Sequence, residues 1–250
     1  MAKPPENHAG HGARPGRAAL LWARVTAEPA ILAAALIAAL AILAFAKIAD
    51  EVREAHTFSF DDRFLDLLRK NGEPGHAVGP EWLTGVMRDF SALGSAAVVS
   101  LVVLSTVGYL AIQRRRRAAW TIIAASVGGT LIAAALKLTF SRPRPDLAFH
   151  LTEVDSTSFP SGHSMESAVV YLTLGAMLAR LTPGTRGKVF VLGAALCITG
   201  LVGFSRAFLG VHYATDVLGG WSAGLAWALV CWIAARKLRR DNRPGGDVAS

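Results

Sequence analysis

The chain has few cysteines and few charged residues for its length, and each shortage excludes a class of protein. Only two cysteines, Cys197 and Cys231, occur among 250 residues, and both lie in apolar stretches. A disulfide framework or a cysteine-rich metal site is therefore not expected, and we interpret the two as small core residues. Charged residues make up 18% of the chain and hydrophobic residues 52%. Soluble domains carry about 25% charged residues, so these proportions indicate a membrane protein.

Long apolar stretches predict where the chain crosses the membrane. A helix needs about 20 residues to span a hydrocarbon core of about 30 Å, and six blocks approach this length with few charges inside them. They cover residues 29–49, 92–113, 118–138, 164–181, 188–204 and 215–235. We therefore predict an all-α, polytopic membrane protein with six transmembrane helices. One domain would cover residues 25–240, between tails at 1–24 and 241–250 that we expect to be disordered.

The basic residues predict the orientation of these spans. A net charge of +8 would suit a nucleic-acid partner, but the basic residues stand at block ends without interleaved aromatic residues, so no nucleic acid is expected. They fill every second loop: Arg14, Arg17 and Arg24; Arg114–Arg117; Arg180, Arg186 and Lys188; and Arg236, Lys237, Arg239 and Arg240. By the positive-inside rule, both termini and these loops are cytoplasmic. The first block is then an uncleaved anchor.

The loop at 50–91 would lie on the other side of the membrane, with those at 139–163 and 205–214. It predicts two short helices at the membrane interface. Apolar and charged residues alternate over residues 58–69 in the pattern of a helix lying along a membrane surface, and Asn71-Gly72 ends it. A second helix is expected from Pro80 towards Phe90, with Trp82 at headgroup depth.

Three basic residues stand close together at the end of the third block: Lys137, Arg142 and Arg144, which Pro145 follows. A cation at membrane depth costs roughly 2.5–3.5 kcal/mol, so the cluster favours an anionic partner. The alternative is that Lys137 extends to the membrane surface and the arginines bind lipid headgroups. Both interpretations stay open for this segment alone.

The segment Pro160-Ser161-Gly162-His163 is expected to form the turn into the fourth block. A helix N-terminus offers unpaired N–H groups and a positive dipole end, and Gly162 lets an anion approach the backbone closely. Ser161 would cap the helix, donate to a phosphate oxygen, or do both. The alternative for His163 is a structural role at the interface.

Ser205-Arg206 ends the fifth block, and His212 and Asp216 open the sixth with an i, i+4 spacing. That spacing would place the carboxylate on the same helical face as the imidazole, where it fixes the tautomer and stabilises the imidazolium. A structural salt bridge between Arg206 and Asp216 is the alternative. All three segments fall on one predicted side of the membrane, whereas the cytoplasmic loops contain no histidine.

Together these segments resemble the complete three-part signature of the type 2 phosphatidic acid phosphatase family. The matching pattern is Lys137, six residues and Arg144-Pro145; then Pro160-Ser161-Gly162-His163; then Ser205-Arg206, five residues, His212, three residues and Asp216. No signature position departs from the family, the resemblance covers roughly residues 29–235, and Arg142 lies outside the signature. It implies a membrane-bound lipid phosphatase that uses no metal and no other cofactor.

The resemblance also implies a role for each residue of the signature. His212 would attack phosphorus and form a phosphohistidine, Asp216 would orient His212, and His163 would protonate the departing oxygen and later activate water. The phosphate-binding residues would be Lys137, Arg144, Ser161, Gly162 and Arg206. Such preorganised donors stabilise transition-state charge, and a nucleophile divides one difficult step into two. His212 would start neutral and His163 charged, so we expect a bell-shaped dependence of rate on pH.

The expected partner is a phosphorylated lipid: undecaprenyl diphosphate, phosphatidic acid, phosphatidylglycerol phosphate or a lipid A phosphate. The sequence does not choose among them, nor does it give the oligomeric state. One alternative is a lipid phosphotransferase on the same scaffold, and a less favoured one is a transporter or binding protein that uses the cations but not the histidines. The expected location is a bacterial inner membrane, with the site facing the periplasm or exterior.

Overall fold

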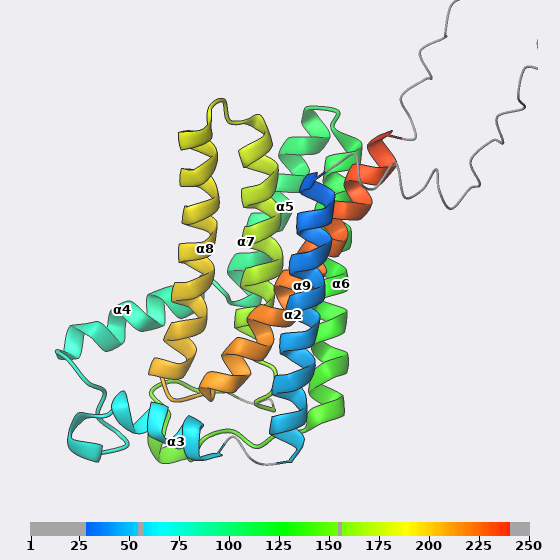
Figure 1. Ribbon diagram of the computed structural model, residues 1–250. Helices are drawn as coiled ribbons and strands as arrows, with labels where there is room; N and C mark the ends of the chain where they lie inside the picture. Colours follow the sequence, from blue (N-terminus) through cyan, green and yellow to red (C-terminus); the bar gives the residue numbers. More distant parts are fainter. Residues whose placement is uncertain (1–28, 55–57, 155–156, 241–250) are drawn as a thin grey trace, which may run out of the picture.

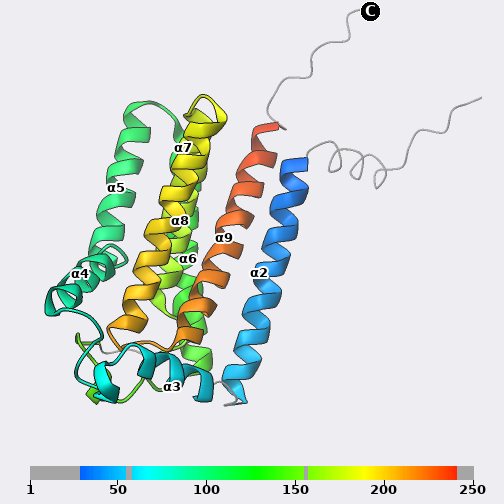
Figure 2. The same cartoon turned by 60° about the vertical axis from the view of Figure 1, so that its left-hand side comes forward.

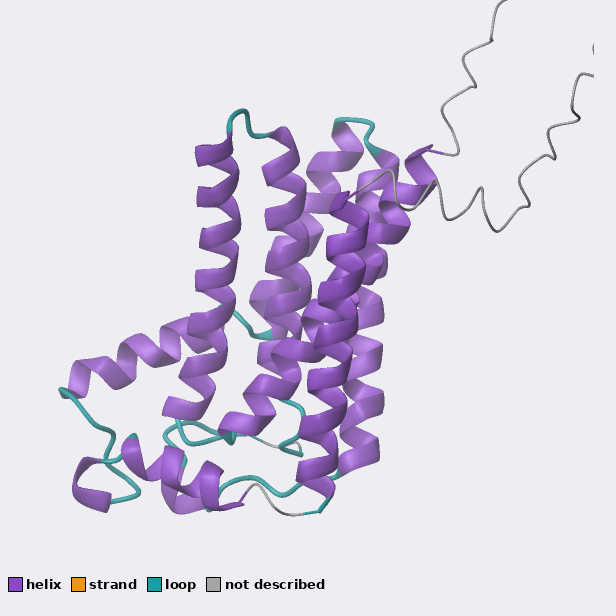
Figure 3. Ribbon diagram, viewed as in Figure 1, coloured by secondary structure: helices purple, strands orange, loops and turns teal. Residues whose placement is uncertain are grey.

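The computed structural model describes residues 29–54, 58–154 and 157–240, and over these ranges it is helical, with no strand (Figure 3). The all-α prediction is thereby confirmed. The predicted tails lie outside the described residues, as do Arg14, Arg17 and Arg24. The α-helices are α2 (Pro29–Arg53), α3 (Phe58–Leu67), α4 (Glu81–Ala92), α5 (Ala96–Ile112), α6 (Arg116–Phe140), α7 (Gly162–Leu181), α8 (Thr185–Phe208) and α9 (Ala214–Arg240).

Six long helices form one bundle, and the connections gather at its two ends (Figure 1). The turns 113–115 and 182–184 lie at the same end as the start of α2 and the finish of α9. The described parts of the loop after α6, residues 141–154 and 157–161, lie at the opposite end with the loop 209–213. There α3 runs across the bundle (Figure 2), and α4 projects sideways (Figure 1). The sequence predicts that the basic loops and the histidine-containing loops lie on opposite sides of the membrane. In the structure they lie at opposite ends of the bundle.

Four helices are long and apolar enough to cross a membrane: α2, α6, α8 and the part of α9 up to Leu238. Helix α5 makes a fifth only when it is joined to α4, from which it is bent by 45°. Outward-facing Leu36 and Leu43 on α2, and Leu104 on α5, are all more than half exposed. A bundle with large apolar side chains on its surface suits a hydrocarbon solvent, where they face lipid.

Helix α7 is not among the helices that meet this test, although the sequence predicts a span at 164–181. Its first two turns carry His163, Ser164, Glu166 and Ser167. The helix packs against α5, α6, α8 and α9, so much of its surface meets other helices. A central helix can therefore carry polar residues that a lipid-facing helix cannot.

Glycines allow α9 to lie against the start of α7. A Cβ added to Gly220 would lie 2.6 Å from the carbonyl oxygen of Ser161, and one added to Gly224 would lie 2.6 Å from that of Met165. Both approaches are closer than any side chain tolerates, so glycine at these positions lets the two helices approach closely. Gly193 on α8, by contrast, has open space around it. Likewise Cys231 is buried as predicted, whereas Cys197 faces outward on α8 and is not a core residue.

The segment between α2 and α5 covers the end of the bundle that carries the histidine loops. Helices α3 and α4 form where short helices were expected, and their position at a membrane interface stays a prediction. Arg69, which is buried, donates from Nη1 to the carbonyl oxygen of Phe208 at 3.0 Å and from Nη2 to that of Phe149 at 2.9 Å. This guanidinium ties the end of α8 to the loop that follows α6.

The loop after α8 needs glycine at position 210. Gly210 has φ +71°, and an added Cβ would collide with the carbonyl oxygen of Phe149 and with the Arg69 side chain. Gly184 has a similar φ of +74°, but nothing lies within 4 Å of its added Cβ. A side chain at Gly210 would meet both backbone strain and a collision, whereas a side chain at Gly184 would meet backbone strain alone.

Gly210→Ala is expected to lower the free energy of unfolding by roughly 2 kcal/mol or more, because the methyl group adds a collision to a strained backbone. Gly184→Ala, the control without a collision, should lose less than Gly210→Ala, about 1–3 kcal/mol from the backbone alone, because a φ of +74° with a ψ of 154° is almost exclusive to glycine. Thermal unfolding of both variants in detergent measures the difference. Equal losses would show that the packing of Gly210 against Phe149 contributes nothing.

Candidate active site

The loop that leaves α6 brings the first group of cations to the site. Lys137 lies in the last turn of α6, and its Nζ donates to the carbonyl oxygen of Thr157 at 2.9 Å. The helix ends at Phe140 with Ser141 in the left-handed conformation. Arg144 then reaches across to the loop after α8, where its Nη1 donates to the carbonyl oxygen of Val211 at 2.5 Å. This loop therefore joins α6 to the segment that contains His212.

Ser161 caps the N-terminus of α7, which is one of the two roles expected for it. Its Oγ accepts from the backbone N–H of Ser164 at 3.4 Å and from the Ser164 hydroxyl at 2.9 Å. A Cβ added to Gly162 would lie 3.6 Å from Cε of Lys137, so the lysine side chain passes over this glycine. Lys137 and the N-terminus of α7 thus converge on one place, which suits an anion.

Arg206 enters the site from the last turn of α8. The residue is only 5% exposed, and its Nη1 donates to the hydroxyl of Ser91 at 2.7 Å. Its Nε is buried with no hydrogen-bond partner among the described residues. A buried donor without an acceptor is costly, and a phosphate oxygen would satisfy it.

His212 and Asp216 lie together, but not for the reason that their spacing suggested. Helix α9 begins at Ala214, so His212 belongs to the preceding loop and the two residues do not share a helical face. The backbone N–H of Tyr213 donates to Asp216 Oδ2 at 2.8 Å, which folds the loop over the carboxylate. Nδ1 of His212 consequently lies 3.4 Å from the same oxygen. The predicted contact is present, and a loop creates it.

The partners of His212 define which of its two ring nitrogens carries the proton. Nη1 of Arg144 lies 3.2 Å from Nε2 of His212. Because a guanidinium can only donate, Nε2 acts as the acceptor in this arrangement, and Nδ1 carries the proton towards Asp216. The Nε2 lone pair therefore points towards the cations, where a phosphate group would bind.

Burial keeps His212 neutral. The side chain is almost completely buried, and burial lowers the pKa of His212 to about 4, with the charge and hydrogen bond of Asp216 offsetting this only in part. Arg144 and Arg206 lower it further. A neutral imidazole with a fixed tautomer is the form that a nucleophile needs.

Asp216 forms its strongest ion pair with Arg142 and not with Arg206, the partner suggested by the alternative interpretation. Nη1 of Arg142 lies 2.6 Å from Asp216 Oδ1, and Nη2 lies 2.8 Å from Oδ2 of Asp61 on α3. The hydroxyl of Ser158 also donates to Asp216 Oδ2. Burial opposes the charge of Arg142, but the two carboxylates outweigh burial and raise the pKa of Arg142.

Asp61 is the residue that the sequence analysis missed. It is completely buried, yet the sequence shows it as one of several charges on an amphipathic helix, next to the exposed Asp62. No local signal separates the two aspartates. Arg142 was noted with an open role, and its two carboxylate partners now define its surroundings.

The predicted residues from three segments meet at one end of the bundle. The imidazole of His163, in the first turn of α7, is close enough to interact electrostatically with Arg206, His212, Lys137 and Arg144. Lys137 in turn interacts with Arg144 and Arg206. The arrangement is a cluster of cations around two histidines. Over residues 29–54, 58–154 and 157–240, no group of three or more His, Cys, Asp or Glu side chains is placed to hold a metal ion.

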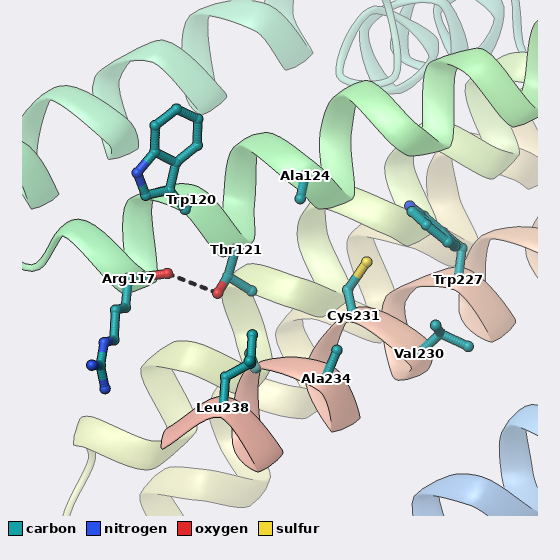
Figure 4. A pocket seen from close by; sticks show the side chains of 10 residues that line it. Arg117, Trp120, Thr121, Ala124, Trp227, Val230, Cys231, Ala234 and Leu238 are labelled. Carbon is teal, nitrogen blue, oxygen red and sulfur yellow. Dashed lines mark hydrogen bonds between the residues drawn. The ribbon is translucent and has the colours of Figure 1, made fainter. Parts of the chain in front are cut away.

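A large groove lies far from this cluster, between α6 and α9 near the opposite end of the bundle (Figure 4). It encloses about 490 Å³ and is lined mainly by apolar side chains, among them Trp120, Trp227 and Val230. The Arg117 side chain points away from these residues (Figure 4). The groove has no histidine and no carboxylate, so it has no part in the chemistry of the cluster.

A helical membrane protein that gathers arginines, a lysine and a His–Asp pair at one end has the make-up of an enzyme that acts on phosphate esters. A family model of the PAP2 superfamily matches residues 117–240. Phosphatidylglycerophosphatase B of Bacillus subtilis (strain 168) is 40% identical over 149 residues, which are 58% of this chain and 71% of that protein. Decaprenylphosphoryl-5-phosphoribose phosphatase of Mycobacterium tuberculosis is 30% identical over 129 residues, 50% of this chain and 66% of that protein.

Two solved structures share the fold. The crystal structure of a transmembrane PAP2-type phosphatidylglycerolphosphate phosphatase from Bacillus subtilis aligns with a TM-score of 0.74 and 29% identity, covering 81% of this chain and 98% of that one. Aquifex aeolicus LpxE aligns with a TM-score of 0.52 and 24% identity over 71% of this chain and 95% of that one, and supports the fold alone. The chain belongs to the PAP2 superfamily, and it is a phosphatase of the membrane lipid phosphatase type.

The protonation of His212 can be tested directly. Because its pKa is lowered to about 4, the imidazole of the substrate-free protein should stay neutral from about pH 8 to about pH 5, protonated on Nδ1. Nitrogen NMR of histidine-labelled protein checks this, with His212→Gln assigning the signal. A His212 signal that titrates near the ordinary histidine value of about 6.5 would contradict the buried, neutral state.

Proposed function

We propose that the chain hydrolyses a phosphate monoester on a lipid through a phosphohistidine on His212, without a metal. The observation that carries the proposal is the pairing of Nδ1 of His212 with Asp216 while Nε2 is directed at Arg144. A neutral, oriented imidazole next to cations is the arrangement required for attack on phosphorus.

In the first step, Nε2 of His212 forms a bond to phosphorus as the bond between phosphorus and the ester oxygen breaks. The imidazole becomes positively charged during this attack, and Asp216 stabilises that charge from the Nδ1 side. In the second step, water attacks phosphorus, the N–P bond breaks, and neutral His212 returns with inorganic phosphate as product. The nucleophile thereby divides hydrolysis into two easier displacements.

His163 is the group that we assign to proton transfer. It lies at the N-terminus of α7, within electrostatic range of His212. The departing alkoxide takes a proton from His163 in the first step, and in the second step His163 receives one from the attacking water. A phosphate dianion among the surrounding cations supplies the negative charge that favours protonated His163 in the substrate complex.

The cations stabilise the three non-bridging oxygens in the transition state. Lys137, Arg144 and Arg206 approach from α6, the following loop and α8, and Ser161 and the backbone of Gly162 lie at the N-terminus of α7. Their positions are held before substrate arrives, so little reorganisation accompanies the reaction. The buried Nε of Arg206 gains an acceptor when phosphate binds.

The names of the two curated relatives narrow the substrates worth testing first. Phosphatidylglycerophosphatase and decaprenylphosphoryl-5-phosphoribose phosphatase are both named for a phosphate monoester on a polar group that is joined to a lipid. We therefore place phosphatidylglycerol phosphate first. Undecaprenyl diphosphate, phosphatidic acid and lipid A phosphates follow as comparisons.

The proposed topology has six spans, α2, α5, α6, α7, α8 and α9, with both termini in the cytoplasm of a bacterial cell. The site end of the bundle then faces the periplasm or exterior near the headgroups. Support comes from the basic residues at the other end of the bundle, Arg114–Arg117, Arg180, Arg186 and Lys188.

The first experiment measures phosphate release by purified protein in detergent, with EDTA present, from these lipids. Release should persist in EDTA and fall by about 10³-fold or more in His212→Ala, because the nucleophile is lost. A newly phosphorylated lipid in place of inorganic phosphate would support the transferase alternative. Activity that survives His212→Ala would contradict the mechanism.

The role of His163 predicts a dependence on the leaving group. His163→Ala should slow release from a lipid substrate by about 10²–10⁴-fold, since an alkoxide needs a proton to depart. Formation of the phosphohistidine from an aryl phosphate, whose leaving group departs without protonation, should be affected much less. Single-turnover measurements of both substrates test this, and equal losses for both would contradict a general-acid role.

A further inference from the structure

We infer that Asp61 and Arg142 are positioning residues that hold Asp216 against His212, so that helix α3 belongs to the active site. The inference rests on the proposed roles of His212 and Asp216. It goes beyond them because neither Asp61 nor Arg142 lies in the matching sequence signature.

Arg142 connects two buried carboxylates. Its side chain is 4% exposed, and those of Asp61 and Asp216 are completely buried. Nη1 contacts Asp216 Oδ1 at 2.6 Å and Nη2 contacts Asp61 Oδ2 at 2.8 Å. The guanidinium also lies over the ring of Tyr213, 4.3 Å from its centre. Buried charges are stable only when they are paired. Asp61 therefore fixes the position of Arg142, and Arg142 fixes the position of Asp216.

Arg142 supplies the contact that prevents Asp216 from rotating. Oδ2 of Asp216 already receives the Ser158 hydroxyl and the backbone N–H of Tyr213, and it faces Nδ1 of His212. Oδ1 is held by Arg142. With both oxygens engaged, Oδ2 stays directed at His212, and the 3.4 Å separation can shorten when the imidazole becomes positive.

Asp61 acts on the same aspartate by a second route, through the first turn of α9. Its Oδ1 accepts from the backbone N–H of Thr215 at 3.0 Å, and its Oδ2 accepts from the Thr215 hydroxyl at 2.6 Å. A carboxylate at a helix N-terminus is favourable, and here it comes from another helix. Asp61 therefore anchors the residue directly before Asp216 as well as the arginine that binds Asp216.

The network of Asp61, Arg142 and Asp216 also determines the electrostatic potential at His212. The charged or titratable groups that face it are Asp216 from α9, Arg144 from the loop after α6, Arg206 from α8 and His163 from α7. Behind Asp216, the positive Arg142 and negative Asp61 act in opposite directions. Loss of Asp61 leaves Arg142 uncompensated and makes protonation of His212 less favourable. Loss of Arg142 makes protonation more favourable.

These opposite signs give a test that a purely structural role would not satisfy. The variants are Asp61→Asn, Arg142→Gln and the double variant, compared with the wild type by the pH dependence of kcat/KM for phosphate release. Asp62→Asn is the matched control, because Asp62 is the exposed neighbour of Asp61 on the same helix. Elution volume in size-exclusion chromatography reports folding of each variant.

Asp61→Asn should lower kcat by about 10- to 100-fold and move the acid limb of kcat/KM to lower pH, since only neutral His212 attacks. Arg142→Gln should lower kcat and move the limb to higher pH, and the double variant should lie between them. Asp62→Asn should match the wild type. If Arg142→Gln does not fold, Asp61→Asn decides alone, because it keeps the contact between Arg142 and Asp216.

Two results would overturn the inference. One is a folded Asp61→Asn variant with the kcat of the wild type and an unchanged acid limb of kcat/KM. The other is an acid limb that moves in the same direction in Asp61→Asn and in Arg142→Gln. The proposed function is judged separately by His212→Ala in the same assay. If His212→Ala is inactive and Asp61→Asn behaves as the wild type, the positioning role is wrong and the proposed function is still supported.

Discussion

The arrangement of this site depends on the burial of charge at one end of an apolar bundle. Asp61, Arg142 and Asp216 are removed from water, and each is stabilised by an oppositely charged neighbour at 2.6–2.8 Å. Removing one partner of a buried pair typically costs about 3–5 kcal/mol, because the other charge stays buried and uncompensated. The pairing therefore fixes α3, the loop after α6 and the start of α9 relative to one another. The position of His212 depends on these paired charges, because the loop that contains it folds over Asp216.

A second group of charges serves a different purpose. Arg206 donates to a neutral hydroxyl of Ser91 and retains a buried Nε without a partner among the described residues. Arg144 donates to the carbonyl oxygen of Val211 and to the lone pair of His212. The neutral acceptor leaves much of the positive charge of Arg206 available, so a phosphate group would gain more from this arginine than Ser91 does. One set of charges thus builds the candidate site, and in the proposed mechanism the other binds the phosphate group.

The sequence predicted the bundle well where apolar length alone decided the outcome. Helices α2, α6, α8 and α9 fall on predicted blocks, because a bilayer imposes a minimum apolar length that is visible in composition. It predicted the start of α5 less well. The block was expected from residue 92, but Gly94 and Ser95 interrupt it, and Ser95 caps α5 by accepting from the N–H of Val98. Short-range capping chemistry overrode the hydrophobic pattern there.

The sequence predicted that the residues of the candidate site lie together, but it did not predict their connections. Signature spacing brought His163, His212 and Asp216 together, whereas the contact between the last two arises from a loop that the i, i+4 argument did not foresee. The ion pair of Arg142 with Asp61 joins positions 81 residues apart. Such a long-range pairing depends on how α3 crosses the end of the bundle (Figure 2), and local pattern contains no information about that crossing.

In the proposed mechanism, His212 carries the phosphoryl group between the two steps. The most direct test is to mix the enzyme with phosphatidylglycerol phosphate, quench in alkali within one turnover and locate phosphate by mass spectrometry. Alkali is chosen because a phosphorus–nitrogen bond to histidine survives it. If the mechanism is right, a phosphorylated peptide that contains His212 forms and disappears at rates that match turnover. Rapid turnover with no phosphate on His212, or with phosphate on another residue, would contradict it.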